Sequence, residues 1–302
     1  MKEKILFLEP YFEDKIWGND FFLKNNFNVK SSTVGEAFIV SALKNKSSYI
    51  INKDISLYDF FNDPKNSYFF NGYNKPYPLL VKIISASDDL SVQVHPDNKY
   101  ALDKHKMLGK NECWYILDST PNNSIIYGHK ALSKEEIKKF IEQNNWDFLK
   151  SLPISKNDFI YVPAGKIHAI KKGTLIFELQ QSSDITYRLY DYNRLENNKK
   201  RDLHIEDSLN VITVPDDEID LIKEGKENSY LINNDFFSLL KVKIFISKTL
   251  FIPLALWLQI TVIKGFGKVN GSTIKKYDSF IVAHGTKLNF VGFIEILVSY
   301  IK

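Results

Sequence analysis

The sequence predicts a mainly β fold made of two β-units, with a small helical insertion in the first. The chain has 16 Tyr and 22 Phe among its 302 residues, and aromatic side chains favour the pleated, half-buried surface of a sheet. Short runs rich in Val, Ile, Phe and Tyr recur along the chain, separated by clusters of Asn, Asp, Gly and Pro. This spacing is typical of strands in a sandwich or a barrel.

The first β-unit is expected to hold many short strands and one longer helix. Its clearest apolar runs lie at 38–43, 79–84, 113–117, 159–162 and 175–180. Between 133 and 152, apolar residues recur at roughly helical spacing, and Ser133 followed by Glu136 forms a capping box at the start. A second, shorter helix is expected at 205–211.

The second β-unit is expected to begin after an acidic, polar stretch at 215–228, which is typical of a linker. Beyond about residue 229 the chain returns to apolar runs with Gly-containing turns, which favour hairpins. We therefore predict two domains. The first covers residues 1–225, with a helical insertion near 131–152, and the second covers residues 226–302.

Composition and charge argue against several classes of protein. The net charge is +4, and Lys and Arg are spread along the chain, whereas a nucleic-acid binder more often concentrates them on one stripe. A mild positive excess still suits an anionic small molecule. Cys113 is the only cysteine, so no disulfide within the chain is possible. The longest apolar run, at 250–263, is interrupted by Pro253 and Gln259 and is too short to span a membrane. We expect no membrane association and a cytoplasmic protein.

Polar residues at alternate positions of two expected strands carry the chemical signal. Alternate side chains of a strand share one face, so Gln93 and His95 project together from the run LSVQVHPD. By the same rule Lys110 and Glu112 share a face in the run GKNECWYIL. Cys113 then points the other way, and we expect a buried, inert thiol there.

Four donors make a chemically sensible metal site: Gln93, His95, Glu112 and His168, the last of which follows the Pro-Ala-Gly turn of YVPAGKIHAI. Two imidazoles, one carboxylate and one amide carbonyl are nitrogen and oxygen donors that suit Zn²⁺, Fe²⁺ or Mn²⁺. Without thiolates the set is typical of a catalytic site rather than a structural one. A single Q-x-H on a strand is more often an ordinary surface pair. The succession Q-x-H-P, K-x-E-x-W and P-A-G-x-x-H favours the metal site.

Six blocks in this order resemble the type I mannose-6-phosphate isomerases in their short bacterial form, which belong to the cupin superfamily. The blocks are EPYFEDKIWG, GEAFIVSA, PLLVKIISASDDLSVQVHPD, GKNECWYIL, VPAGKIHAI and FELQQSSDITYRLYDYNR. They cover roughly the first two-thirds of the chain. The resemblance implies two cupin-like, jelly-roll β-barrels, the second without metal ligands.

The same resemblance implies a function and a site. It implies a zinc-dependent isomerase of carbohydrate metabolism that interconverts mannose 6-phosphate and fructose 6-phosphate by moving a proton between C2 and C1. One Zn²⁺ per chain would be held by Gln93, His95, Glu112 and His168. The catalytic residues would be Arg188, Lys110 and Glu178, and the substrate-binding residues Lys82, Lys110 and Arg188. The partner would be a small sugar phosphate, without nucleic acid, and the chain a monomer or weak homodimer.

Two other functions stay open from the residues alone. His95, Glu112 and His168 could form the two-histidine, one-carboxylate set of a non-haem iron oxygenase. A catalytically silent, sugar-binding cupin is the other. The remaining histidines in this part of the chain, His105, His129 and His204, have no ligand spacing, and we expect them at the surface.

Overall fold

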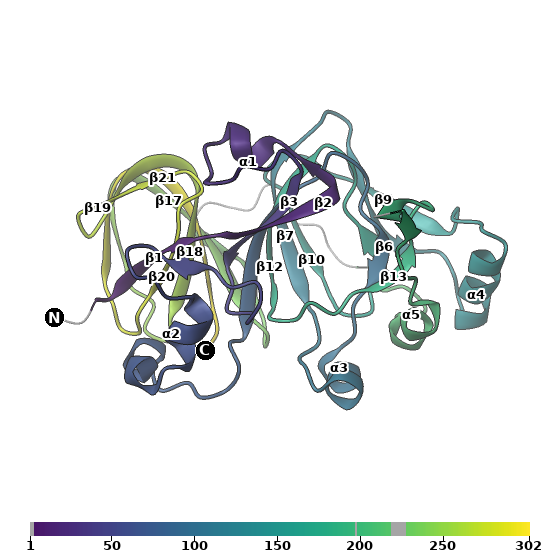
Figure 1. Ribbon diagram of the computed structural model, residues 1–302, viewed down its shortest axis with the longest axis horizontal. Coiled ribbons are helices and arrows are strands. Elements are labelled where there is room, and N and C mark those ends of the chain that lie inside the picture. The colour runs from purple at the N-terminus through teal and green to yellow at the C-terminus, as the bar shows by residue number, and fades with distance from the viewer. Residues whose placement is uncertain (1–2, 197, 219–227) are drawn as a thin grey trace. The chain divides into compact units, whose positions relative to one another are not determined.

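The computed structural model of the chain describes residues 3–196, 198–218 and 228–302, and these form two compact units (Figure 1). Unit A comprises the segments Met1–Tyr11, Ala37–Lys82 and Glu224–Lys302, and unit B comprises Phe12–Glu36 and Ile83–Lys223. The fold is mainly β, as the sequence predicts. None of the helices in the described ranges is long and apolar enough to cross a membrane.

Unit A is built on one sheet that joins the two ends of the chain. Its described strands are β1 (Ile5–Glu9), β4 (Tyr49–Ile50), β16 (Ser229–Asn233), β17 (Ser238–Leu250), β18 (Leu258–Val269), β19 (Ser272–Lys275), β20 (Ser279–Val282) and β21 (Leu288–Tyr300). The helix α2 (Leu57–Asn62) and the 3₁₀ helix η1 (Pro64–Phe70) accompany them. The strand order is β16-β17-β21-β18-β20-β1-β4, with β19 paired to β18. In Figure 1 the purple β1 therefore lies beside the yellow-green β20.

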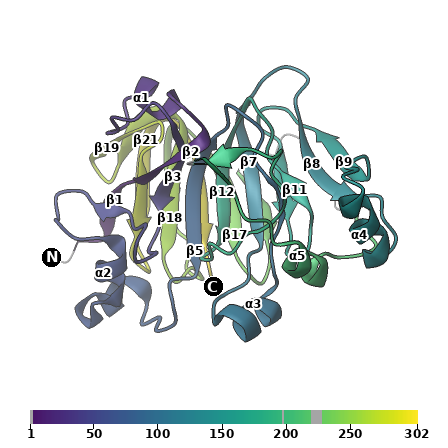
Figure 2. The same cartoon turned by 45° about the vertical axis from the view of Figure 1, so that its right-hand side comes forward.

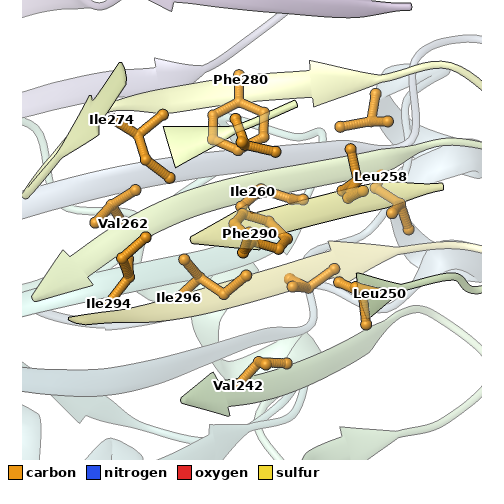
Figure 3. Packing of buried hydrophobic residues seen from close by; sticks show 14 of the residues in the cluster. Val242, Leu250, Leu258, Ile260, Val262, Ile274, Phe280, Phe290, Ile294 and Ile296 are labelled. Carbon is orange, nitrogen blue, oxygen red and sulfur yellow. The ribbon is translucent and has the colours of Figure 1, made fainter. Parts of the chain in front are cut away.

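Apolar side chains fill the interior of unit A. In β18 the alternate residues Leu258, Ile260 and Val262 are buried in one cluster (Figure 3). Phe280 from β20 and Phe290 from β21 join them. The strands exist because this period-two pattern buries one face of each strand against the others, and each fully buried side chain contributes roughly 1.5–3 kcal/mol.

Unit B contains the remaining elements. Its described strands are β6 (Val92–Val94), β7 (Glu112–Ser119), β8 (Ser124–His129), β9 (Leu149–Pro153), β10 (Phe159–Val162), β11 (His168–Ala169), β12 (Thr174–Gln181), β13 (Tyr187–Tyr190), β14 (Leu195–Glu196) and β15 (Lys199–Lys200). Its helices are α1 (Phe21–Lys24), α3 (Asn98–His105), α4 (Lys134–Glu142) and α5 (Ile205–Val211). The unit boundaries fall in or beside β2 (Tyr11–Asn19), β3 (Val34–Val40) and β5 (Leu79–Ser85).

Two sheets of unit B matter for the site. One contains β10-β7-β12 and continues through β5, β3 and β2; the other has the order β13-β6-β11-β8-β9. The strands β7 and β12 lie side by side in both views (Figures 1 and 2) and pair antiparallel from Thr174↔Ser119 to Gln180↔Glu112. A short two-stranded sheet, β14-β15, completes the described set.

The expected helices are partly corrected. The helix at 205–211 is found as α5, and Ser133 accepts a hydrogen bond from the backbone of Glu136 at the start of α4. However, α4 ends at Glu142, and residues 149–153 form the strand β9 rather than the end of a helix. The interruption comes from Asn144, whose φ of 50° places it in the left-handed region, a conformation that ends helices.

The two units differ from the predicted domains. Residues 1–11 and 37–82 group with the C-terminal strands in unit A rather than with the rest of 1–225. The predicted boundary at 225/226 itself falls in 219–227, outside the described residues. Local patterns could not show this grouping, because β1 pairs with β20 from the other end of the chain.

Candidate metal centre

Three strands of unit B place polar side chains in one row. His168 in β11 pairs with Gln93 in β6, and Gln93 pairs on its other side with Arg188 in β13. Residues directly paired across neighbouring strands project from the same face of the sheet. The three side chains Arg188, Gln93 and His168 are therefore neighbours although they are far apart in the sequence.

The second sheet of unit B supplies the carboxylate. Glu112 begins β7, and its carboxylate Oε1 lies 3.4 Å from Nε2 of His168, while Oε2 lies 3.5 Å from Nε2 of His95. The ligand atoms of His95, Glu112 and His168 lie within 4.8 Å of one another, and all three residues are buried. The structure thus brings these three predicted donors together.

Backbone carbonyls orient both imidazoles toward Glu112. Nδ1 of His95 lies 2.9 Å from the carbonyl oxygen of Ile185, and Nδ1 of His168 lies 2.9 Å from that of Lys166. A carbonyl can only accept, so each Nδ1 carries a proton, and in the neutral ring Nε2 then presents a lone pair. This is the arrangement by which proteins fix metal-binding histidines.

Burial keeps His168 neutral. The ring is fully buried, and this burial lowers its pKa to about 4, because a charged imidazolium is costly in a low-dielectric interior. The nearby Lys110 ammonium lowers the pKa further, while the hydrogen bond to Lys166 opposes the shift. At neutral pH the Nε2 lone pair of His168 is therefore available to a cation.

The Gln93 side chain lies beside the His168 imidazole. Its amide nitrogen lies 3.3 Å from Nε2 of His168. The amide oxygen and nitrogen exchange places when the group rotates by half a turn, so the carbonyl oxygen can occupy this position. The structure thus places the Gln93 side chain beside the His168 imidazole.

The buried carboxylate of Glu112 fits a divalent cation. Its nearest cationic neighbour is the Lys110 ammonium, 2.9 Å from Oε2, and both side chains are almost inaccessible to water. Among the described residues no donor makes a hydrogen bond of good geometry to either carboxylate oxygen. A buried carboxylate normally has such partners. Two imidazole lone pairs and these two oxygens facing one point match the nitrogen and oxygen ligands of a catalytic metal.

A network of buried amides holds the segment that carries Lys110 and Glu112. Both the backbone and the side chain of Asn111 donate to Oε1 of Gln181, at 3.0 and 2.8 Å. The Asn111 carbonyl oxygen Oδ1 accepts from Tyr161 and from the backbone of Ala164. Asn111 was not a predicted site residue, yet it fixes the position of its two neighbours.

Glu178 lies on the same face as Glu112. It pairs with Trp114 across β12 and β7, and the Trp114 indole N–H donates to its Oε1 at 3.3 Å. Trp114 also packs edge-on against His168, with ring centroids 5.4 Å apart. Glu178 is buried, so its carboxylate faces the interior of unit B, as strand alternation predicts. Cys113 points the other way and is buried.

Arg188 is held by two contacts that the sequence did not reveal. Its Nη1 donates to the carbonyl oxygen of Asp202 at 2.9 Å, and its backbone N–H donates to Nδ1 of His204 at 3.2 Å. Burial and the nearby Arg201 lower the pKa of Arg188 from its very high ordinary value. His204 is half-buried and belongs to the support of Arg188, so the expectation of a surface residue is wrong.

His129, His105 and Lys82 were also named in the sequence analysis. His129 is 1% exposed and its Nε2 donates to the carbonyl oxygen of Thr213, which also corrects the surface expectation, while His105 is exposed. Lys82 is the last residue of its segment in unit A, is buried, and places its ammonium 4.9 Å from the ring centre of Phe38.

The fold and the buried His-Glu-His cluster define a metal-binding protein of the cupin class. The family model "Phosphomannose isomerase type I, catalytic domain" matches residues 5–123. The mannose-6-phosphate isomerase of Streptococcus mutans is 38% identical over 98% of both chains, and ManA of Bacillus subtilis is 36% identical over 100% of both. The crystal structure of the mannose 6-phosphate isomerase from Bacillus subtilis has a TM-score of 0.89 at 35% identity, covering 99% of this chain and 100% of that one. The chain belongs to the type I mannose-6-phosphate isomerase family.

Proposed function

We propose that this enzyme interconverts mannose 6-phosphate and fructose 6-phosphate, with one Zn²⁺ ion held by Gln93, His95, Glu112 and His168. The proposal rests on the convergence of two buried imidazoles on one buried carboxylate. The relatives named as mannose-6-phosphate isomerases supply the substrate. When bound, the metal supplies Lewis-acid polarisation of the substrate oxygens.

The reaction requires two proton transfers. One proton leaves C2 of the aldose and is returned to C1, and another moves from the C2 oxygen to the C1 oxygen. Glu178 is the proposed base for the carbon-bound proton, because it is a buried carboxylate on the interior face, oriented by the Trp114 indole. Lys110 is buried beside Glu112. We propose that it carries the second proton between the C2 oxygen and the C1 oxygen of the substrate.

Arg188 is proposed to bind the anionic part of the substrate. Its pairing with Gln93 supports this role, because paired residues of neighbouring strands project from the same face. Its planar guanidinium suits a phosphate or a developing oxyanion. The carbonyl of Asp202 holds one edge of the guanidinium. Lys82 stays a proposed substrate-binding residue, with its ammonium buried in unit A.

A non-haem iron oxygenase could use the same His95, Glu112 and His168 set. The proposed fourth donor, Gln93, would fill a position that such an enzyme leaves open, and the relatives at 36–39% identity carry the isomerase name. The isomerase is therefore the better-supported function. Oxygen consumption by the iron-loaded protein would favour the oxygenase.

A coupled assay tests the function directly. The protein is stripped with a chelator and then supplied with Zn²⁺, Fe²⁺ or Mn²⁺ before mannose 6-phosphate is added. We expect turnover to disappear on stripping and to return with metal, without oxygen uptake. Absence of turnover with every metal, while the sugar phosphate still binds, would identify a silent sugar-binding relative instead.

A second assay tests the proposed base. The Glu178→Gln variant keeps the hydrogen bond to Trp114 but cannot take a proton. We expect it to lose exchange of the C2 proton with solvent while it retains its metal. Exchange at the wild-type rate would assign the base to another residue.

A further inference from the structure

The orientation of His168 depends on the loop that precedes it. His168 donates through Nδ1 to the carbonyl oxygen of Lys166, two residues earlier. The direction in which Nε2 points toward Glu112 is therefore set by where the Lys166 carbonyl lies. This loop, at 163–167, contains Gly165 with a φ of 85°, so its path is a tight turn rather than part of a strand.

The side chain of Lys166 anchors this loop in the interior. Only 3% of the side chain is exposed, and its ammonium lies 2.6 Å from Oδ1 of Asp216. The ammonium also donates to the carbonyl oxygen of Asp217 and lies 5.0 Å from the ring centre of Tyr127. A buried ammonium is tolerated only when it is paired, because removing a charge from water is costly.

Asp216 is in turn fixed from several sides. Its side chain is 5% exposed, and its Oδ2 lies 3.2 Å from the ammonium of Lys150 and 3.4 Å from the backbone nitrogen of His129. Gly128 lies so close that a Cβ atom there would overlap Oδ2 of Asp216. Buried His129 also donates to the carbonyl oxygen of Thr213, which holds the chain just before Asp216.

These contacts form a continuous chain of support within unit B. Asp216 holds the ammonium of Lys166, the Lys166 backbone holds Nδ1 of His168, and His168 faces Glu112. Gly165 adds to the same connection, since its carbonyl oxygen accepts from the backbone of Thr213 and its N–H donates to the carbonyl of His95. The loop thus touches both imidazole ligands and the segment of Asp216.

We propose that Asp216 is a positioning residue of the metal centre, which acts through its buried ion pair with Lys166 to fix the carbonyl that orients His168. The inference rests on the proposed metal binding at His168. It adds a residue that touches neither metal nor substrate. Loss of the Asp216 charge would leave the Lys166 ammonium buried without its carboxylate, and the loop would shift to hydrate it.

The test measures Zn²⁺ affinity in competition with a chromophoric chelator. We expect Asp216→Asn to weaken Zn²⁺ binding about tenfold, which lies at the lower end of the effect of residues behind metal ligands. The Co²⁺-loaded variant should also show a changed visible spectrum, because the ligand geometry is altered. The control is Lys150→Met, which removes the other cation on Asp216 but leaves Lys166 untouched; its affinity should stay within about twofold.

A double-mutant cycle shows whether Asp216 acts through Lys166. Lys166→Met leaves Asp216 with Lys150 as a partner, so this variant is expected to fold even where Asp216→Asn does not. If the proposal is correct, Lys166→Met weakens Zn²⁺ binding, and adding Asp216→Asn causes no further loss. Circular dichroism and thermal unfolding of the metal-free proteins verify the fold.

Three results would overturn the inference. They are wild-type affinity in Asp216→Asn, wild-type affinity in Lys166→Met, or losses that multiply in the double variant. A wild-type protein that binds no Zn²⁺ would instead remove the proposed function itself, and the inference with it. The two failures are therefore distinguishable.

Discussion

The interiors of the two units differ in what their inward-facing side chains are. In unit A the alternate residues of β18 are Leu258, Ile260 and Val262, packed in an apolar cluster. In unit B the corresponding inward positions of β7 and β12 include Glu112 and Glu178, both buried. The β architecture therefore supplies inward-facing positions, and the residue types at those positions decide what the interior can do. A few buried imidazoles and carboxylates give the interior of unit B a candidate metal centre, while apolar residues make the interior of unit A a source of stability.

Removal of the central carboxylate, Glu112, should have the largest effect on activity. We expect Glu112→Gln to lower kcat/KM by roughly a thousandfold or more, because loss of one transition-state contact alone costs about 10²–10³ and metal affinity falls as well. The coupled assay and metal analysis measure the two effects. The control in unit A is Thr261→Val, which removes only a hydroxyl contact to Ser279 and should leave kcat/KM within about twofold. Metal retention with wild-type turnover in Glu112→Gln would contradict the site.

A smaller loss of kcat/KM is expected when Arg188, the proposed substrate-binding residue of unit B, is replaced. Arg188→Ala should lower kcat/KM by about a hundredfold, in the range of one lost oxyanion contact, and keep its metal. Arg188→Lys should recover only part of the activity, since an ammonium does not reproduce the planar fork. Stoichiometric loss of metal from Arg188→Ala would show a structural role instead.

Stability should depend on pH because of the buried His168 in unit B. His168 has a pKa of about 4 in the folded protein and about 6.5 when unfolded. Between these values the unfolded chain binds the proton and the folded chain does not, so stability is complete above about pH 6.5 and falls as the pH drops toward about 4. For the metal-free protein we expect a loss of about 2 kcal/mol between pH 7.5 and pH 5, measured by urea unfolding. His168→Asn should remove most of this slope; an unchanged slope would exclude His168 as its cause.

The smallest effect on stability is expected from a substitution in the apolar interior of unit A. Ile260 is fully buried in the cluster of unit A (Figure 3), and Ile260→Val deletes one methylene group. We expect about 1 kcal/mol of destabilisation, measured by denaturant unfolding, with kcat/KM and metal affinity unchanged. A drop in turnover larger than twofold would mean that unit A contributes more than stability.

Strand alternation allowed most of the candidate site to be predicted, because its period is short and its residues lie in strong runs. Alternation put Gln93 and His95 on one face, and the structure brings His95 together with Glu112 and with His168, which follows the turn that the Pro-Ala-Gly sequence indicates. The buried His129 could have been found by the same reasoning, since it ends the apolar run IIYGH of β8.

Other features depend on contacts that no local pattern reports. Lys166 and Asp216 are 50 residues apart, and each looks like an ordinary charged surface residue in the sequence. The helical spacing at 133–152 was overextended because Phe148 packs on Phe140 from outside the helix. The two adjacent residues Asn144 and Asn145 were the available signal for the helix end.

The pairing of β1 with β20 has a consequence for synthesis on the ribosome. Ile5 lies opposite Val282, so on this edge β1 must wait for a partner strand that is translated much later in the chain. Until then its hydrogen-bonding edge is open to other chains, and nascent chains with such edges are prone to associate. The five-residue length of β1 limits this hazard during the wait.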